Sequence, residues 1–159
     1  MQDLTRQQLQ INLNRLVGRA QRAGGWDIPT WTYQVKAQLV RLGQRAGYQT
    51  CTNGTVRGAR WDKEWLYDLV WVHASDGFVV QDVFLVAEIE WRGTRAIQQD
   101  FQKLLLARAD CRVLIFDDIA GLRDQLIEQA RTFGKSRRGD CYLLASYRDG
   151  RFSVHEEII

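Results

Sequence analysis

The chain has 159 residues with a net charge of +3, and its 45% hydrophobic and 26% charged residues are typical of a globular domain with a core. No apolar run approaches the roughly 18 residues of a membrane span, so we expect no membrane partner. The polar start of the chain lacks a signal-peptide pattern, and three widely spaced cysteines offer no zinc site, so we expect a cytoplasmic protein with free buried thiols.

The first 46 residues predict two helices. The first begins at Asp3 or Thr5 and stops at Gly24-Gly25, and the second begins near Pro29 and runs to about Arg45. Apolar residues recur at helical spacing in both segments, so each helix presents one face to a core.

Residues 47–159 predict a mixed β-sheet with two further helices. We expect helices over about 95–109 and from a cap at Asp117 or Asp118 to Gly134. The order of elements predicts one α/β (α+β) domain, 1–159, in which a mixed sheet is flanked by helices. Strands are predicted over 48–52, 61–72, 78–91, 111–116, 141–147 and 151–155.

The charge is unevenly distributed along the chain. Residues 1–60 hold nine Lys or Arg and two Asp or Glu, whereas residues 61–159 hold 13 and 17. Arginines outnumber lysines by 18 to four, and the planar guanidinium suits phosphate. A basic half beside an acidic site is typical of a nucleic-acid enzyme, with solvated helix faces as the alternative. The candidate nucleic-acid contacts are Arg41, Arg45, Arg57 and Arg60.

Two predicted strands carry acidic residues in an apolar setting. Asp68 lies in the first strand, and Glu88 and Glu90 lie in the second. Because alternate residues of a strand point the same way, Glu88 and Glu90 project from one face. Buried carboxylates are costly without a partner, and three together suit a divalent cation such as Mg²⁺ or Mn²⁺. The alternative is a solvated strand end for the two glutamates and an arginine partner for Asp68.

This ordered set resembles the PD-(D/E)XK nuclease superfamily, in which an Asp on the second core strand precedes Glu-x-Lys on the third and then a helix. Asp68 matches the aspartate and Glu88 the glutamate, while Glu90 stands where lysine is usual. The resemblance covers residues 45–120 and is nearest to an uncharacterised bacterial group within the superfamily. The segments that carry it are Glu64-Trp65-Leu66-Tyr67-Asp68-Leu69-Val70-Trp71, Glu88-Ile89-Glu90-Trp91 and Asp100-Phe101-Gln102-Lys103-Leu104-Leu105.

The resemblance implies a restriction-endonuclease-like fold and Mg²⁺- or Mn²⁺-dependent hydrolysis of phosphodiester bonds, with DNA favoured over RNA. It implies that Asp68 and Glu88 bind the ion with the scissile phosphate, and that Glu90 binds a second ion or orients water. It also implies that Lys103, from the following helix, replaces the missing lysine and stabilises charge on the phosphate. A solvated helix lysine is the alternative for Lys103.

The register of the two acidic strands decides whether the carboxylates meet. A tight turn centred on Asp76 pairs residues whose numbers sum to 152, which leaves Asp68 roughly 13 Å along the strand from Glu88 and sets Glu64 opposite Glu88. A longer connection, with pairs near a sum of 156, brings Asp68 to Glu88, and a bulge has a similar effect. We favour the longer connection and keep Glu64 as a secondary candidate.

Two further functions compete with the enzyme. One is a catalytically inactive nuclease-fold protein that binds nucleic acid or a protein. The other is a structural or regulatory subunit, such as a homodimer that uses exposed tryptophans and the edge strand 151–155.

Overall fold

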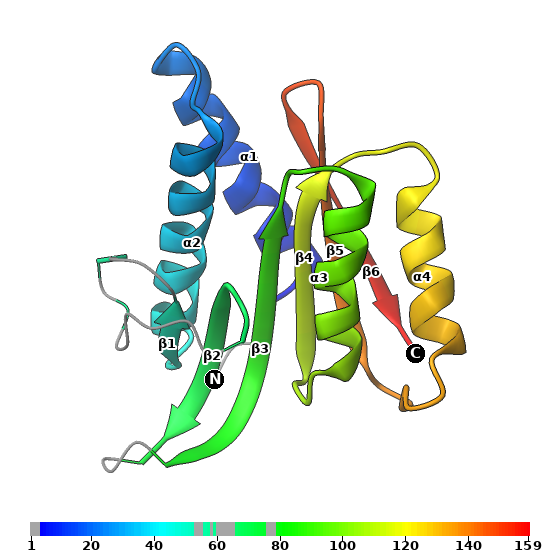
Figure 1. Cartoon of the computed structure of the whole chain (residues 1–159). Helices are drawn as coiled ribbons and strands as arrows, with labels where there is room; N and C mark the ends of the chain where they lie inside the picture. The colour runs from blue at the N-terminus through cyan, green and yellow to red at the C-terminus, as the bar shows by residue number, and fades with distance from the viewer. Residues whose placement is uncertain (1–3, 53–55, 58, 60–65, 76–78) are drawn as a thin grey trace.

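The computed structural model describes residues 4–52, 56, 57, 59, 66–75 and 79–159. Within these residues, six strands form one open mixed sheet accompanied by four helices, so the predicted mixed α+β architecture is confirmed (Figure 1). The elements are α1 (Arg6–Arg22), α2 (Ile28–Arg45), β1 (Gln49–Thr52), β2 (Leu69–Ala74), β3 (Val80–Glu90), α3 (Thr94–Leu106), β4 (Cys111–Asp117), α4 (Leu122–Thr132), β5 (Cys141–Arg148) and β6 (Arg151–Ile158).

The strands follow one another across the sheet in the order of the sequence, from β1 to β6. The pairs β3–β4 and β4–β5 are parallel, and the other three pairs are antiparallel. The last residues of β3, β4 and β5 therefore lie at one end of the sheet, which we call its carboxyl end, and their first residues lie at its amino end (Figure 1).

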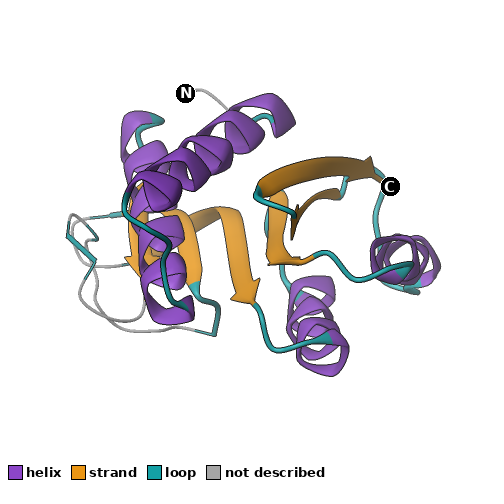
Figure 2. Cartoon of the chain, turned by 90° about the horizontal axis from the view of Figure 1, so that it is seen from above, coloured by secondary structure: helices purple, strands orange, loops and turns teal. Residues whose placement is uncertain are grey.

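Helices cover both faces of the sheet. Leu13 of α1 and Leu39 of α2 share a core with Trp71 and Leu85 of the sheet, whereas Phe101 of α3 belongs to the second core with α4. Figure 2 shows α1 on the opposite side of the sheet from α3 and α4. In the part of the chain described above, no helix has both the length and the apolar character needed to cross a membrane.

The N-terminal helices begin at side-chain caps that the sequence contains. The Thr5 hydroxyl accepts from Gln8 N and the Gln8 side chain accepts from Thr5 N, which completes a capping box at α1, while Asp27 caps α2. Further along α1, Asn14 exchanges two hydrogen bonds of 2.9 and 3.0 Å with the backbone of Phe152 in β6. Gln10 Oε1 also accepts from Val154 N at 3.1 Å. These bonds fasten α1 to the outer edge of β6.

The predicted helix over about 95–109 ends at Leu106, the predicted strand over 151–155 runs to Ile158, and two predicted starts are wrong for identifiable reasons. The strand predicted over 61–72 begins at Leu69, because residues 66–68 form a bend in which the Asp68 carbonyl accepts from the Thr52 hydroxyl; residues 61–65 lie outside the described part. The helix predicted from Asp117 or Asp118 begins at Leu122 after Gly121. Asp117 instead ends β4, and Asp118 bonds through its N–H to Tyr147 O.

The register that we favoured is confirmed in the part of the β2–β3 pair next to Asp68. Leu69 pairs with Ala87 and Trp71 with Leu85, so residue numbers sum to 156 next to Asp68. Nearer the connection the sum falls to 154, at the pair Ala74–Val80, because the ladder shifts twice. The strand irregularities and the longer connection together bring Asp68 level with Glu88.

The contact between α2 and β2 yields a test of the packing. A Cβ built on Gly43 lies 2.8 Å from Thr50 Cγ2 and from the Trp71 ring, whereas one built on Gly18 of α1 meets only the end of Arg22 at 3.5 Å. Gly43→Ala should lower the free energy of unfolding by about 1–3 kcal/mol. Gly18→Ala should raise it by about 0.5–1 kcal/mol, because only helix propensity changes. Urea denaturation of both variants measures the difference, and stabilisation by Gly43→Ala would contradict the close contact.

Candidate active site

A cavity of about 270 Å³ lies at the carboxyl end of β3. Four of the predicted site residues line it: Asp68 from the bend before β2, Glu88 and Glu90 from β3, and Lys103 from α3. The first turns of α2 close it from the other side through Ile28 and Thr32. The structure therefore gathers residues from separate elements, as their order in the sequence predicts.

Two contacts fix the carboxylate of Asp68. Its Oδ2 accepts a 2.9 Å hydrogen bond from Ile89 N, and its Oδ1 lies 2.9 Å from Lys36 Nζ. Lys36 projects from the middle of α2, and its side chain is only 8% exposed. Ionised groups with so little access to water require a partner, so Lys36 and Asp68 depend on each other.

Glu88 is the most deeply buried acid of the cavity, at 2% exposure. Lys103 Nζ lies 2.7 Å from Glu88 Oε1 and 2.9 Å from Asp100 Oδ1, one turn earlier on α3. Burial raises the pKa of Glu88 to about 8, with nearby Asp100 and Asp68 acting in the same direction against Lys103. Burial also disfavours the charged form of Lys103, but its bonds to Glu88 and Asp100 outweigh this and raise its pKa.

Glu90 is held by its neighbours at the end of β3. Its Oε1 accepts from the backbone N–H groups of Trp91 and Arg92, both at 2.8 Å, and its carboxylate pairs with the Arg92 guanidinium. The bonds with Arg92 lower the pKa of Glu90 in spite of its partial burial. Glu90 is therefore a firmly ionised carboxylate, in contrast to Glu88.

Cations compensate most of the carboxylates of the cavity. Arg92 and Lys103 line it together with Asp68, Glu88, Glu90 and Asp100, and Lys36 reaches Asp68 from α2 without lining the cavity. Among the described residues, no group of three or more Asp, Glu, His or Cys side chains has an arrangement that would hold a metal ion. Side chains of opposite charge, rather than a ring of ligands, compensate the carboxylates in this arrangement.

A divalent cation nevertheless fits the donor chemistry. Mg²⁺ takes oxygen ligands and commonly only one or two protein carboxylates, with water and phosphate completing its shell. Apart from the Lys103 ion pair, Glu88 Oε1 has no hydrogen-bond partner in the described part of the chain. Asp68 and Glu88 are the pair that would hold such an ion.

Three of the four predicted nucleic-acid arginines do not line this cavity. Arg41 and Arg45 are exposed on α2, and Arg41 lies roughly 14 Å along the helix axis from Thr32. Arg57 is also exposed and outside the cavity wall. Arg60 and Glu64 lie outside the described residues, so their predicted roles are untested. The arginine at the cavity is Arg92, whose side chain is 79% exposed.

Lys36 and Arg92 are the site residues that the sequence analysis missed. Lys36 carried a usable signal, because it is the only charged residue between Ile28 and Val40 in a helix whose neighbouring positions are buried. Arg92 follows Glu90 at a strand end, and an arginine that only contacts solvent at such a position has the same sequence pattern.

Comparison with protein-family models, curated protein sequences and solved structures found no significant match. Any function inferred for the cavity therefore rests on its own residues and on their order in the sequence.

The raised pKa of Glu88 predicts a pH-dependent stability. Because the folded state holds this proton more tightly than the unfolded chain, the contribution of Glu88 to stability falls as pH rises from about 4.5 to about 8. Relative to Glu88→Gln, the wild-type protein should therefore lose unfolding free energy as the pH rises through this range. Urea titrations at several pH values measure the loss. Glu128→Gln, on the exposed side of α4, is the control, and a flat difference for Glu88→Gln would contradict the burial.

The Lys36–Asp68 pair predicts strong coupling between two distant parts of the sequence. Lys36→Met should destabilise the protein by about 3 kcal/mol, because it leaves the Asp68 carboxylate without its cation. In an Asp68→Asn background the same change should cost much less. A double-mutant cycle from chemical denaturation measures the interaction, and equal costs in both backgrounds would show that the pair contributes nothing.

Proposed function

We propose that the protein is a nuclease-like enzyme with a restriction-endonuclease-like fold, which hydrolyses phosphodiester bonds in DNA with Mg²⁺ or Mn²⁺. One observation supports this most directly. Asp68, Glu88, Glu90 and Lys103, selected by their order in the sequence, line one cavity, and Lys103 lies 2.7 Å from Glu88. A carboxylate pair can hold a metal ion, and an adjacent lysine can stabilise negative charge on a phosphate, so these side chains suit metal-assisted phosphodiester hydrolysis.

Each side chain has a role in this proposal. Asp68 and Glu88 would hold the ion, and the chemistry that it would supply is activation of water and compensation of negative charge on the phosphate. Lys103, whose Nζ lies 2.7 Å from Glu88 Oε1, would stabilise negative charge on the scissile phosphate. Lys36 keeps Asp68 oriented through its 2.9 Å contact.

Arg92 links substrate binding to Glu90. Its guanidinium is largely exposed while it pairs with Glu90, so a DNA phosphate can compete for it. Release from Arg92 leaves the Glu90 carboxylate free to orient the attacking water.

A second candidate function also has support. The cations Lys36, Arg92 and Lys103 already compensate Asp68, Glu90 and Glu88, so the cavity is close to neutral without a metal ion. This balance favours a catalytically inactive nuclease-fold protein that binds nucleic acid or a protein partner. Such a protein keeps the charge network for stability alone.

Metal titration and cleavage separate the two functions. Titration calorimetry with Mn²⁺ or Mg²⁺, alone and with a DNA duplex, should show binding to the wild-type protein that Glu88→Ala abolishes. Nicking of supercoiled plasmid in Mg²⁺ should fall about 100-fold or more in the same variant. Asp124→Ala, at an acid that is 78% exposed on α4, is the control and should leave both readouts unchanged.

The opposite result would favour the inactive protein. If the wild-type protein binds no metal ion even with DNA present, the proposed hydrolysis is wrong. DNA binding that persists without metal and falls on Arg92→Gln would then assign the cavity to nucleic-acid binding. Cleavage that Glu88→Ala leaves intact would instead indicate a contaminating nuclease.

A further inference from the structure

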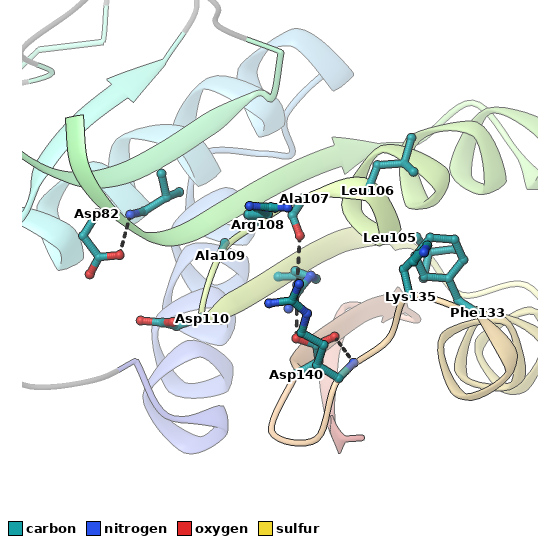
Figure 3. Close-up of a pocket in the computed structure, with 13 residues that line it drawn as sticks. Asp82, Leu105, Leu106, Ala107, Arg108, Ala109, Asp110, Phe133, Lys135 and Asp140 are labelled. Atoms are coloured by element: carbon teal, nitrogen blue, oxygen red, sulfur yellow. Dashed lines mark hydrogen bonds and ion pairs between the residues drawn. The ribbon is translucent and has the colours of Figure 1, made fainter. Parts of the chain in front are cut away.

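A second and larger hollow lies at the amino end of the sheet, away from the carboxylate cavity. It has a volume of about 660 Å³ and lies between the end of α3 with the following segment 107–110 and the loop 133–140 after α4 (Figure 3). An adjoining hollow of about 600 Å³ shares five of its lining residues, among them Arg137 and Asp140. We call the two together the amino-end groove.

Basic side chains dominate the charge of this groove. Arg108, Lys135 and Arg137 are exposed and line the larger hollow, and Arg138 lines the adjoining one. Asp140 lines both hollows, with Oδ2 accepting a 2.8 Å hydrogen bond from Arg137 N, so this acid also shapes the loop. Asp82 and Asp110 are the remaining acids, which gives a groove rich in donors with a few acceptors.

Arg112, the second residue of β4, lines the groove and is only 5% exposed. Its Nη2 donates to Ala107 O at 2.9 Å and lies 3.3 Å from Asp140 Oδ1, and its guanidinium lies 5.1 Å from the Tyr142 ring. Its Nε and Nη1 have no hydrogen-bond partner among the described residues. A buried arginine is costly unless its donors are used, so this guanidinium has capacity for another acceptor.

The chemistry of the walls indicates the class of ligand. Guanidinium and ammonium groups recognise phosphate, to which arginine can donate two parallel hydrogen bonds. Leu106 is 74% exposed and lines the groove with Phe133, which offers an apolar surface for an organic ring. Asp82 and Asp110 can accept from hydroxyl or amino groups. Phosphate, ring and hydroxyl or amino donors occur together in a nucleotide.

We propose that the amino-end groove binds the phosphate of a nucleotide, either free or at the end of a nucleic-acid strand, through Arg108, Arg112, Lys135 and Arg137. The groove and the carboxylate cavity lie at opposite ends of the sheet, so this site is independent of the proposed hydrolysis. Nothing in the site requires Asp68, Glu88 or Lys103.

Calorimetry with AMP and adenosine tests the phosphate contact. AMP should bind the wild-type protein, and Lys135→Gln/Arg137→Gln should weaken it at least tenfold. Arg123→Gln/Arg148→Gln, which removes the same charge from a hollow at the carboxyl end, should change AMP affinity less than twofold. Adenosine should bind at least tenfold more weakly than AMP. Equal losses in the two double variants, equal affinities for AMP and adenosine, or no AMP binding at millimolar concentration would overturn the proposal.

Amide chemical shifts in the wild-type protein locate the ligand. AMP should perturb residues 105–112 and 135–140, and it should still do so in Glu88→Gln. Perturbations confined to residues 88–103 would place AMP in the carboxylate cavity and overturn the groove. Because Glu88→Gln is expected to remove metal binding but not AMP binding, failure of the nuclease proposal and failure of this one give different results.

A matched pair of oligonucleotides distinguishes the two sources of phosphate. A strand with a 5′-phosphate should bind more tightly than the same strand with a 5′-hydroxyl if the groove holds a strand end. Equal binding of the two strands, with AMP binding retained and neither strand displaced by AMP, supports a free nucleotide. Two results together would show that the groove does not hold a strand end. AMP, at concentrations that saturate the wild-type protein, would displace neither strand. Both strands would also bind Lys135→Gln/Arg137→Gln as tightly as they bind the wild-type protein.

Discussion

Glu88 is only 2% exposed, and the geometry around β3 and α3 brings a lysine to its carboxyl group. Gly93 turns the chain at a φ of 94°, after which α3 runs back alongside β3. Glu88 lies two residues before the end of β3, and Lys103 is the tenth residue of α3, so the short connection 91–93 returns the lysine to Glu88. A single ion pair therefore constrains the length of the connection, the direction of α3 and the position of Asp100 beside the same lysine.

A cation from the N-terminal helices also compensates a carboxylate of the cavity. Lys36 crosses from α2 to Asp68, and Asp68 in turn accepts from Ile89 N next to Glu88. α2 therefore supplies part of the cavity wall through Ile28 and Thr32, and it supplies a buried cation to Asp68. α2 is part of the site for this reason, although the resemblance to nucleases begins only after it.

The sequence predicted the elements far better than their ends. Hydrophobic periodicity located α1, α2, β3 and β4 closely, because their buried faces are long and regular. It failed at Leu66–Asp68 and at Asp118, where a hydroxyl–carbonyl bond or a backbone bond to a neighbouring strand overrides the local signal. Such contacts join residues distant in sequence and leave no periodic pattern.

The sequence predicted four of the residues that line the candidate site, but it did not predict which side chains form ion pairs there. Spacing placed Glu88 and Glu90 on one face, and both line the cavity, yet only the structure shows that Arg92 engages one and Lys103 the other. Charge along the chain directed attention to Arg41 and Arg45, which lie further along α2. Net charge over 60 residues does not specify which end of an 18-residue helix faces a cavity.

The bonds from α1 to β6 also limit how this sheet can grow. An open edge strand is a template on which another chain can add a strand. Because Asn14 and Gln10 already accept from the N–H groups of Phe152 and Val154, an added strand would first have to displace α1. A homodimer joined through residues 151–155 would lose these bonds, so the edge of β6 is protected against both dimerisation and β-aggregation along this stretch.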